Sequence, residues 1–221
     1  MATAIQERPA SLRSNKTILT SVTASVGALA FALGAPLAAQ AATIEVTEEH
    51  ADIVYIAATE QVGSYFDQDN IGFVGWPSAD DYPIVFDNAA WTTADPLGTG
   101  SLFDSGSYVI PNDHDIEDYL PFVGLNYPAT GGTNDFEVTL SLTPGESSNG
   151  DVRFIDESDD VVLDTDDVNA IYTLSPNTHE HFEIQLDGMG SGTEEYYLTF
   201  TVENTLTSDV ETLETVFIVE N

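Results

Sequence analysis

Apolar and polar residues alternate along most of the chain after residue 42, which is the pattern of β-strands that bury one face. The clearest case is the segment 136–142, where four apolar residues alternate with three polar ones. Similar segments predict strands at 43–47, 52–57, 71–76, 82–86, 106–110, 151–155, 161–163, 171–174, 179–186, 196–202 and 215–219. Gly, Pro, Asn and Asp separate these segments, and none of them has a helical period. The pattern predicts an all-β fold, an antiparallel β-sandwich of immunoglobulin-like or jelly-roll-like type.

The first 41 residues have the composition of a secretory signal peptide. Three basic residues precede an Ala-rich apolar run at 18–37, and Ala39-Gln40-Ala41 fits the A-x-A cleavage pattern. We therefore expect cleavage after Ala41 and a single mature domain at 42–221, with enough chain to bury a sizeable core. An uncleaved membrane anchor is the alternative. The chain has no Cys, which excludes disulfides and a lipid-modified cysteine anchor.

The chain is strongly acidic. Its 38 acidic and four basic residues give a formal net charge of −34 at pH 7, and every basic residue except Arg153 lies within the predicted signal peptide. Such a charge argues against nucleic acid and anionic membrane surfaces as partners. It is typical of adaptation to a salty, halophilic exterior, where screening lengths shrink to about 3 Å at 1 M salt. Loading of the carboxylates with divalent cations is the alternative.

Two of the four histidines lie two residues apart in the segment 179–186. With a strand period of two, the apolar positions 182, 184 and 186 face the core. The polar positions then share one open surface: His179, His181, Glu183 and Gln185. Two imidazoles at this spacing, with about 6–7 Å between their Cβ atoms, can share one zinc ion. The alternative is a pair of solvated side chains on an exposed strand.

A histidine and an aspartate have the same spacing at the start of another predicted strand. His50 and Asp52 could join His179 and His181 in a tetrahedral zinc site, with Glu183 as the other candidate carboxylate. Imidazole favours zinc over calcium, which prefers oxygen ligands. Because the imidazoles must be neutral, we expect binding to weaken as the pH falls through about 6–6.5. A local hydrogen bond at the strand start is the alternative for His50.

The remaining candidates are weaker. His114 lies in a hydrophilic segment at 112–118, and it either adds an imidazole to the zinc site or is a solvated loop residue. The acidic segments 67–70 and 164–169 place oxygen ligands at alternate positions, which makes Ca²⁺ a second possible cofactor. Neither segment matches the EF-hand loop, which needs Gly at position six and Glu at position twelve.

Catalytic motifs are missing from the sequence. There is no Cys, no Gly-x-Ser-x-Gly elbow, and no lysine after Lys16 for a phosphate-binding loop. We therefore do not expect an enzyme. A zinc hydrolase with Glu180 or Glu183 as its general base is the remaining enzymatic alternative.

Several short motifs resemble those of a surface-anchored domain family found in exported actinobacterial and cyanobacterial proteins, whose members carry varied anchors. The segment 49–53, Glu-His-Ala-Asp-Ile, is similar to the family's H-x-D-I/L opening. The segments 120–124 and 145–155 resemble its middle, and 178–182 followed by 196–200 resembles its H-x-H ending. Members of this family accompany zinc or manganese uptake systems or zinc-dependent repression. The resemblance therefore implies a metal-binding role at the cell surface or in the periplasm.

These observations together predict an exported protein that captures or stores zinc outside the cytoplasm. Its partners would be the metal ion and a metal-uptake system or cell-surface component, with no membrane span after signal cleavage. The expected location is secreted, periplasmic or cell-surface. The alternative is a structural or adhesive surface module that binds glycans, with Ca²⁺ for stability and no transition metal; Trp76, Trp91 or Tyr119 would supply its aromatic platform.

Overall fold

The computed structural model describes residues 44–75, 81–87, 91–93, 103, 107–112, 121–128, 132–188 and 192–220. These residues form three β-sheets and one short 3-10 turn, η1 (Gln68–Asn70), with no α-helix in the described part of the chain. Nor do the described residues contain a helix long and apolar enough to cross a membrane. The predicted signal peptide at 1–41 lies outside the described residues, so its cleavage stays a prediction.

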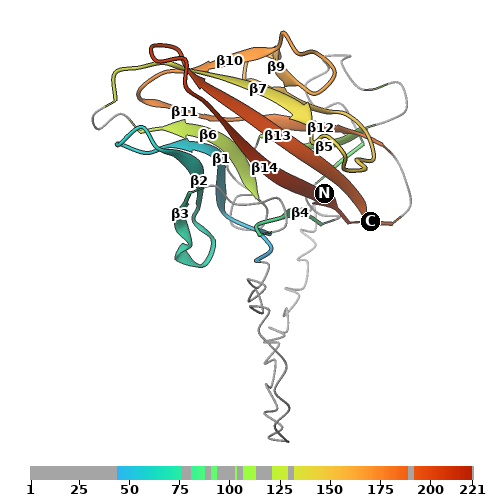
Figure 1. Ribbon diagram of the computed structural model, residues 1–221. Coiled ribbons are helices and arrows are strands. Elements are labelled where there is room, and N and C mark those ends of the chain that lie inside the picture. Colours follow the sequence, from blue (N-terminus) through green and yellow to red (C-terminus); the bar gives the residue numbers. More distant parts are fainter. Residues whose placement is uncertain are drawn as a thin grey trace, which may run out of the picture. The chain divides into compact units, whose positions relative to one another are not determined.

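The first sheet has five strands in the order β11-β6-β1-β2-β3 (Figure 1). They are β1 (His50–Ile56), β2 (Val62–Phe66), β3 (Gly72–Val74), β6 (Phe122–Tyr127) and β11 (Thr178–His181). This sheet therefore combines the beginning of the described chain with two segments that come much later in the sequence.

The other two sheets are built mainly from the C-terminal half. The second sheet has the order β10-β7-β13-β14-β4, and the third has the order β5-β12-β8-β9. The second contains β4 (Ile84–Phe86), β7 (Phe136–Leu142), β10 (Ile171–Leu174), β13 (Glu194–Asn204) and β14 (Val210–Val219). The third contains β5 (Ser107–Ile110), β8 (Val152–Ile155), β9 (Val161–Asp164) and β12 (Glu183–Asp187).

The sheets pack as a sandwich, which confirms the predicted all-β fold. Most neighbouring strands are antiparallel, as expected. Two pairs are parallel, however: β1 with β6, and β14 with β4. Parallel neighbours need long crossover connections, and in both pairs more than 60 residues separate the two strands along the chain. Short apolar segments do not show which distant strand each one pairs with, so the sequence pattern could not predict this.

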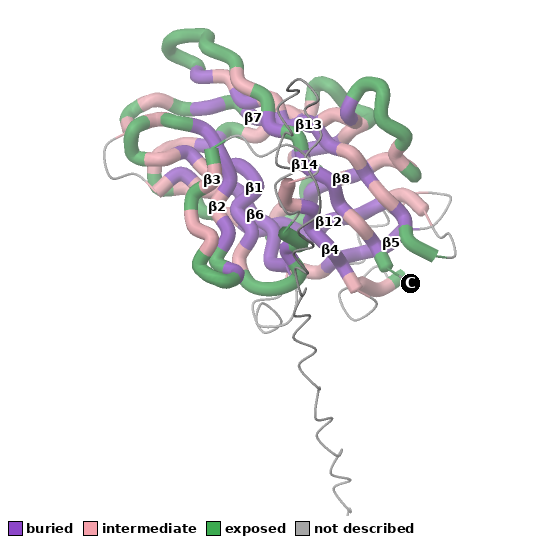
Figure 2. The backbone as a smooth tube through the Cα atoms, turned by 60° about the horizontal axis from the view of Figure 1, so that its bottom comes forward, coloured by how far each residue is buried: buried purple, intermediate pink, exposed green. Residues whose placement is uncertain are grey.

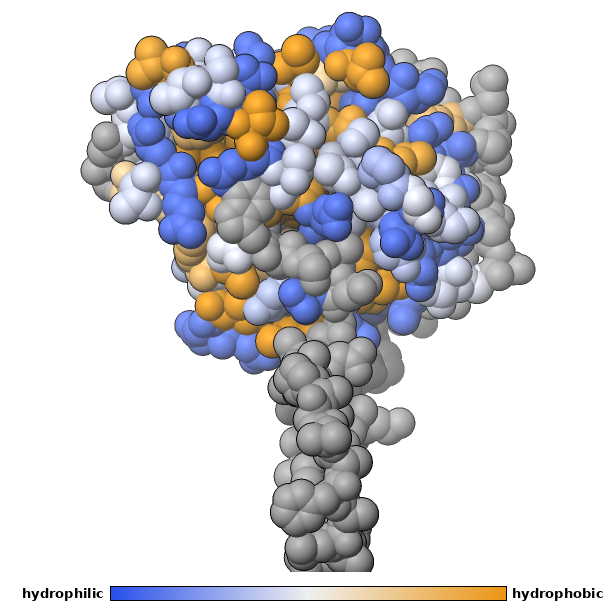
Figure 3. Space-filling model, in the orientation of Figure 1, coloured by the Kyte–Doolittle hydropathy of each residue, from blue (hydrophilic) through white to orange (hydrophobic). Residues whose placement is uncertain are grey.

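The core lies between the sheets, where the apolar positions of each strand meet. The buried backbone in Figure 2 runs through the centres of the strands, while turns and loops are exposed. Phe154 of β8 packs edge-on against Phe182 and Phe200, with ring centroids 5.7 and 5.8 Å apart. Edge-to-face aromatic pairs add about 0.5–1.5 kcal/mol each beyond their buried area. The outer surface is rich in hydrophilic residues, as the face in Figure 3 shows.

The segment 179–186 is not one strand. It forms β11 in the first sheet and β12 in the third, and the chain changes sheet at Phe182. The apolar positions are buried as predicted, but the prediction of one open polar surface is wrong for His181, Glu183 and Gln185, which are 7%, 2% and 0% exposed. β12 is an inner strand of the third sheet, with β5 hydrogen-bonded along one edge and β8 along the other.

Candidate metal centre

Strand β6 lies between β1 and β11 and brings their polar residues together. It pairs in parallel with β1 and antiparallel with β11. Gly124 is the register partner of Asp52 on one side and of His181 on the other. Residues in register share a face of the sheet, and so do residues two apart on one strand. His50 and Asp52 therefore lie on the same face as His179 and His181.

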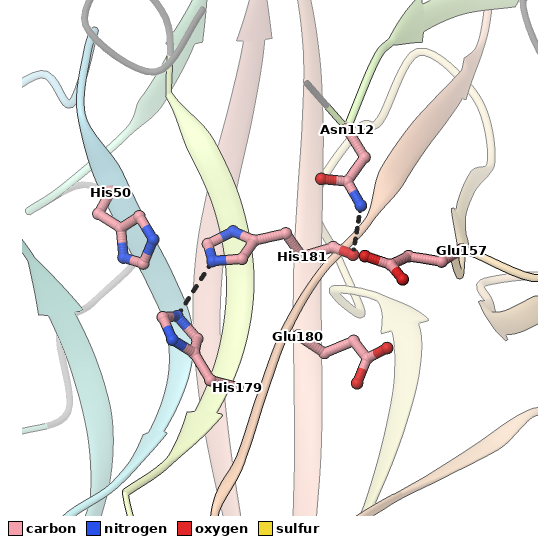
Figure 4. Close-up of a pocket in the computed structure, with 6 residues that line it drawn as sticks. All are labelled: His50, Asn112, Glu157, His179, Glu180 and His181. Atoms are coloured by element: carbon pink, nitrogen blue, oxygen red, sulfur yellow. Dashed lines mark hydrogen bonds between the residues drawn. The ribbon is translucent and has the colours of Figure 1, made fainter. Parts of the chain in front are cut away.

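These four residues form one compact group, which we call the His/Asp cluster. One donor atom from each residue lies within 4.8 Å of the donor atoms of the others. The Nε2 atoms of His179 and His181 are 3.0 Å apart (Figure 4). Oδ1 of Asp52 is 3.3 Å from Nε2 of His179 and 4.0 Å from Nδ1 of His50.

These separations are close to those around a bound metal ion. A tetrahedral zinc ion with ligands at about 2.0–2.1 Å holds its donor atoms roughly 3.3–3.4 Å apart. Small side-chain rotations would bring the more distant donor pairs of the cluster into this range. Three imidazole nitrogens and one carboxylate oxygen form a donor set that suits zinc and other first-row transition metals.

Burial falls steeply from one side of the cluster to the other. The Asp52 side chain is 1% exposed, that of His50 is 18% exposed and that of His179 is 42% exposed. All three imidazoles line a cavity of about 300 Å³, together with Asn112, Glu157 and Glu180 (Figure 4). A metal held by the cluster would therefore rest on a buried carboxylate and be reached from the His179 side.

Asp52 is the most unusual member of the cluster. Its Oδ2 accepts a hydrogen bond of 2.8 Å from Nδ2 of Asn126. Its buried Oδ1 accepts no well-formed hydrogen bond from the described residues, and Nε2 of His179 lies 3.3 Å from it, near enough for the carboxylate to raise the pKa of that imidazole. A buried carboxylate oxygen with incomplete hydrogen bonding is destabilising, by up to about 1–3 kcal/mol where it has no partner at all. A cation between the imidazoles and this oxygen would remove that cost.

Three alternate residues of β6 position the ligands, although β6 itself contributes none. The Phe122 ring stacks on the His181 ring, with centroids 3.8 Å apart and an interplanar angle of 11°. A Cβ atom at Gly124 would lie 3.0 Å from Nδ1 of His181 and 2.7 Å from the carbonyl oxygen of Glu180, so only glycine leaves room for this ring. Asn126 holds Asp52. Such supporting contacts fix the orientation of metal ligands.

The electrostatics of the cluster act most clearly on His179. Its pKa is raised above the ordinary value of 6.5, chiefly because its N–H can reach the Asp52 carboxylate. Burial acts in the opposite direction, and the negative charges of Asp52 and Asp67 add to the increase. The pH at which this imidazole becomes neutral therefore lies above the window of about 6–6.5 that the sequence suggested.

The structure brings together four of the six predicted ligands and places a fifth elsewhere. Glu183 lies in β12 opposite Ile155, and its Oε1 accepts a hydrogen bond from Gln185. It is separated from the cluster because the chain changes sheet at Phe182. His114 lies outside the described residues, so its role stays a prediction.

Within the described residues, neither acidic segment brings three carboxylate or imidazole side chains together, and the His/Asp cluster is the one group that does. Asp164 pairs with Arg153 at 2.7 Å and caps the backbone N–H of Asp166. Oδ1 of Asp167 accepts bonds from the backbone and side chain of Asn169. These carboxylates stabilise turns.

Of the remaining predicted residues, the structure describes Glu180 and Trp91. Glu180 lines the cavity, but its carboxylate accepts a hydrogen bond of 3.2 Å from Tyr172 and points away from the imidazoles (Figure 4). Trp91 donates a hydrogen bond to the carbonyl oxygen of Glu220. Trp76 and Tyr119 lie outside the described residues.

The supporting residues of β6 were not predicted from the sequence. The segment 120–124 resembles a family motif, but Pro121 and Gly124 obscure the strand pattern of this region. The alternation Phe-x-Gly-x-Asn was the available signal, but a glycine that makes room for an imidazole from another strand is recognisable only after the pairing is known.

Comparisons of the chain with protein-family models, with curated proteins and with solved structures found no match. The resemblance to the surface-anchored domain family therefore stays a prediction, and the function must be argued from the cluster itself.

Proposed function

We propose that this protein binds one zinc ion, or a similar transition-metal ion, through His50, Asp52, His179 and His181. The observation that carries the proposal is the convergence of four donor atoms within 4.8 Å of one another, around a buried carboxylate oxygen that lacks a good hydrogen bond. Three imidazoles with one carboxylate disfavour calcium and magnesium, which prefer oxygen ligands.

The exposure of the cluster supports capture or storage rather than a purely structural role. Four protein ligands would fill the tetrahedral coordination of zinc, as they do in structural sites. One of them, His179, is nevertheless 42% exposed and borders the cavity, so a competing ligand from solvent can reach it. We therefore propose that the metal exchanges with the outside of the protein. The N-terminal segment supports export as the setting for this role, and covalent chemistry is no part of the proposal.

The test is a zinc titration of the metal-free protein in 1 M NaCl against a competing chelator, with elemental analysis of the product. High salt suppresses diffuse binding to the acidic surface, because screening lengths fall to about 3 Å. We expect one zinc per chain. The double substitution His179→Ala/His181→Ala should abolish this binding while keeping every carboxylate.

Two further variants complete the zinc titration, one as a test of His114 and one as a charge control. His114→Ala tests whether the fourth histidine contributes, and we expect it to leave the stoichiometry unchanged. Asp160→Asn removes an exposed carboxylate outside the cluster and controls for the loss of one negative charge. Zinc binding that survives the double histidine substitution would overturn the proposal.

A further inference from the structure

A second feature lies on the same face of the first sheet, beside the His/Asp cluster. Tyr55, Tyr65 and Phe73 form what we call the aromatic patch. Tyr65 of β2 is the register partner of Asp52 on β1 and of Phe73 on β3. These residues therefore project from one face. The three strands lie side by side at the left of Figure 1.

An irregularity in β1 brings Tyr55 to this face as well. The pairing of β1 with β2 shifts between Asp52 and Tyr55, so that three steps along β1 match two along β2. Without this bulge, a residue three positions from Asp52 would face the core. With it, Tyr55 pairs with Gly63, on the same face as Tyr65.

The rings of the aromatic patch are in contact and remain accessible. Tyr55 stacks on Tyr65 with centroids 5.2 Å apart, and the centroid of Phe73 lies 5.7 Å from that of Tyr55. Phe73 lies against Gly63, where a Cβ atom would come within 2.6 Å of its ring. Phe73 is nevertheless 37% exposed, and both tyrosines are partly exposed. Exposed apolar groups of this kind mark interaction sites when they are contiguous.

Negative charge borders the aromatic patch. Asp67, an exposed residue, raises the pKa of Tyr65 more than any other group does. Asp52 also raises the pKa of Tyr55, after burial. Aromatic faces attract cations, and neighbouring carboxylates strengthen that attraction.

The described part of the chain has no basic side chain to place on these rings. Arg153 is its one Lys or Arg, and it is used elsewhere: its guanidinium lies 4.0 Å from the centroid of Phe103, and its Nε pairs with Asp164. The aromatic patch and Asp67 likewise place aromatic rings beside a carboxylate, and no lysine or arginine of the described residues lies on them. The described residues therefore supply no lysine or arginine for the patch.

We infer that the aromatic patch and Asp67 form a docking site for an arginine side chain of a partner protein. Charge complementarity supports this occupant, because the chain has a net charge of −34. Arginine suits the site better than lysine, since its planar guanidinium stacks on aromatic rings and binds a carboxylate through two N–H groups. The inference does not depend on metal binding.

The test is an NMR titration of the metal-free protein, in the presence of a chelator, with the peptide acetyl-Gly-Arg-Gly-amide. We expect weak binding, with shifts concentrated on Tyr55, Tyr65 and Phe73. The same peptide with citrulline, which has the shape of arginine without its charge, should not bind. Tyr65→Leu should weaken binding about three- to fivefold, as expected for a cation–π contact at an exposed site. Tyr65→Phe should bind within about twofold of the unsubstituted protein, because it keeps the ring.

A matched pair of charge variants separates a specific site from general attraction. Asp67→Asn should weaken binding of the arginine peptide, whereas Asp160→Asn, with the same change in net charge, should not. Equal effects of these two variants, shifts spread over the whole acidic surface, or equal binding of the citrulline peptide would overturn the inference. So would a neutral oligosaccharide such as maltotriose that shifts the three rings while the arginine peptide does not, because the patch would then be a glycan platform.

Discussion

Asp52 is the residue on which the proposed metal site depends most, because it supplies the buried oxygen at the base of the cluster. The substitution Asp52→Asn keeps the shape and the contact with Asn126 but removes the negative charge. We expect zinc affinity to fall at least tenfold, measured by chelator competition, while Asp160→Asn leaves it unchanged. Asn126→Ala should cost about 10–100-fold, as is usual for residues that orient metal ligands. Unchanged affinity in both Asp52→Asn and Asn126→Ala would rule out Asp52 as a ligand.

The pKa of His179 sets the pH range over which stability and zinc affinity should change. Its raised pKa means that, in the metal-free protein, its contribution to stability is full below about 6.5 and is lost as the pH rises through the higher folded-state value. Zinc binding needs the neutral ring, so its affinity should instead fall as the pH drops through that same value. We expect an NMR titration of the metal-free protein to give a His179 pKa above 6.5, and a lower one in Asp52→Asn. A pKa at or below 6.5 in the unsubstituted protein would contradict the geometry.

At the scale of elements, β6 sets the geometry of the cluster through a residue without a side chain. Gly124→Ala would place a methyl group against the His181 ring and the Glu180 carbonyl oxygen. Overpacking of this kind is destabilising by about 1–3 kcal/mol, and it should also weaken zinc binding. Gly75→Ala is the matched control, because its Cβ atom would approach only the flexible ends of the Gln61 and Phe73 side chains. Equal unfolding free energies and zinc affinities for the two variants would show that Gly124 has no such role.

A comparison of the predicted with the observed strands shows which parts of the fold and of the site the sequence pattern could predict. Period-two alternation predicted β7 and β10 with their observed bounds, and the paired spacing of His50 with Asp52 and of His179 with His181 identified the four clustered residues. It missed β2, in which Gly63 and Ser64 interrupt the apolar pattern. It also misplaced Glu183, because alternation reports which side of a strand is buried but not where the chain changes sheet.

At the scale of the whole molecule, the charge predicts a strong dependence on salt. Arg153 is the one basic residue after Lys16, so acidic side chains repel one another with little internal compensation. Raising NaCl from 0.1 to 2 M shortens the screening length from about 10 Å to under 3 Å. We expect the thermal unfolding midpoint to rise by about 10 °C or more, and by much less in sucrose of matched osmolarity. A midpoint that does not respond to NaCl would contradict adaptation to a salty exterior.

The most direct test of the metal site is the absorption spectrum of the protein loaded with Co²⁺, a spectroscopic substitute for zinc. We predict one Co²⁺ per chain with the intense visible bands of a tetrahedral site of nitrogen and oxygen ligands. Zinc should displace it, and the His179→Ala/His181→Ala protein should lack these bands. Weak, octahedral-type absorption that is the same in both proteins would mean that metal binds only to the acidic surface, and the His/Asp cluster would not be a metal site.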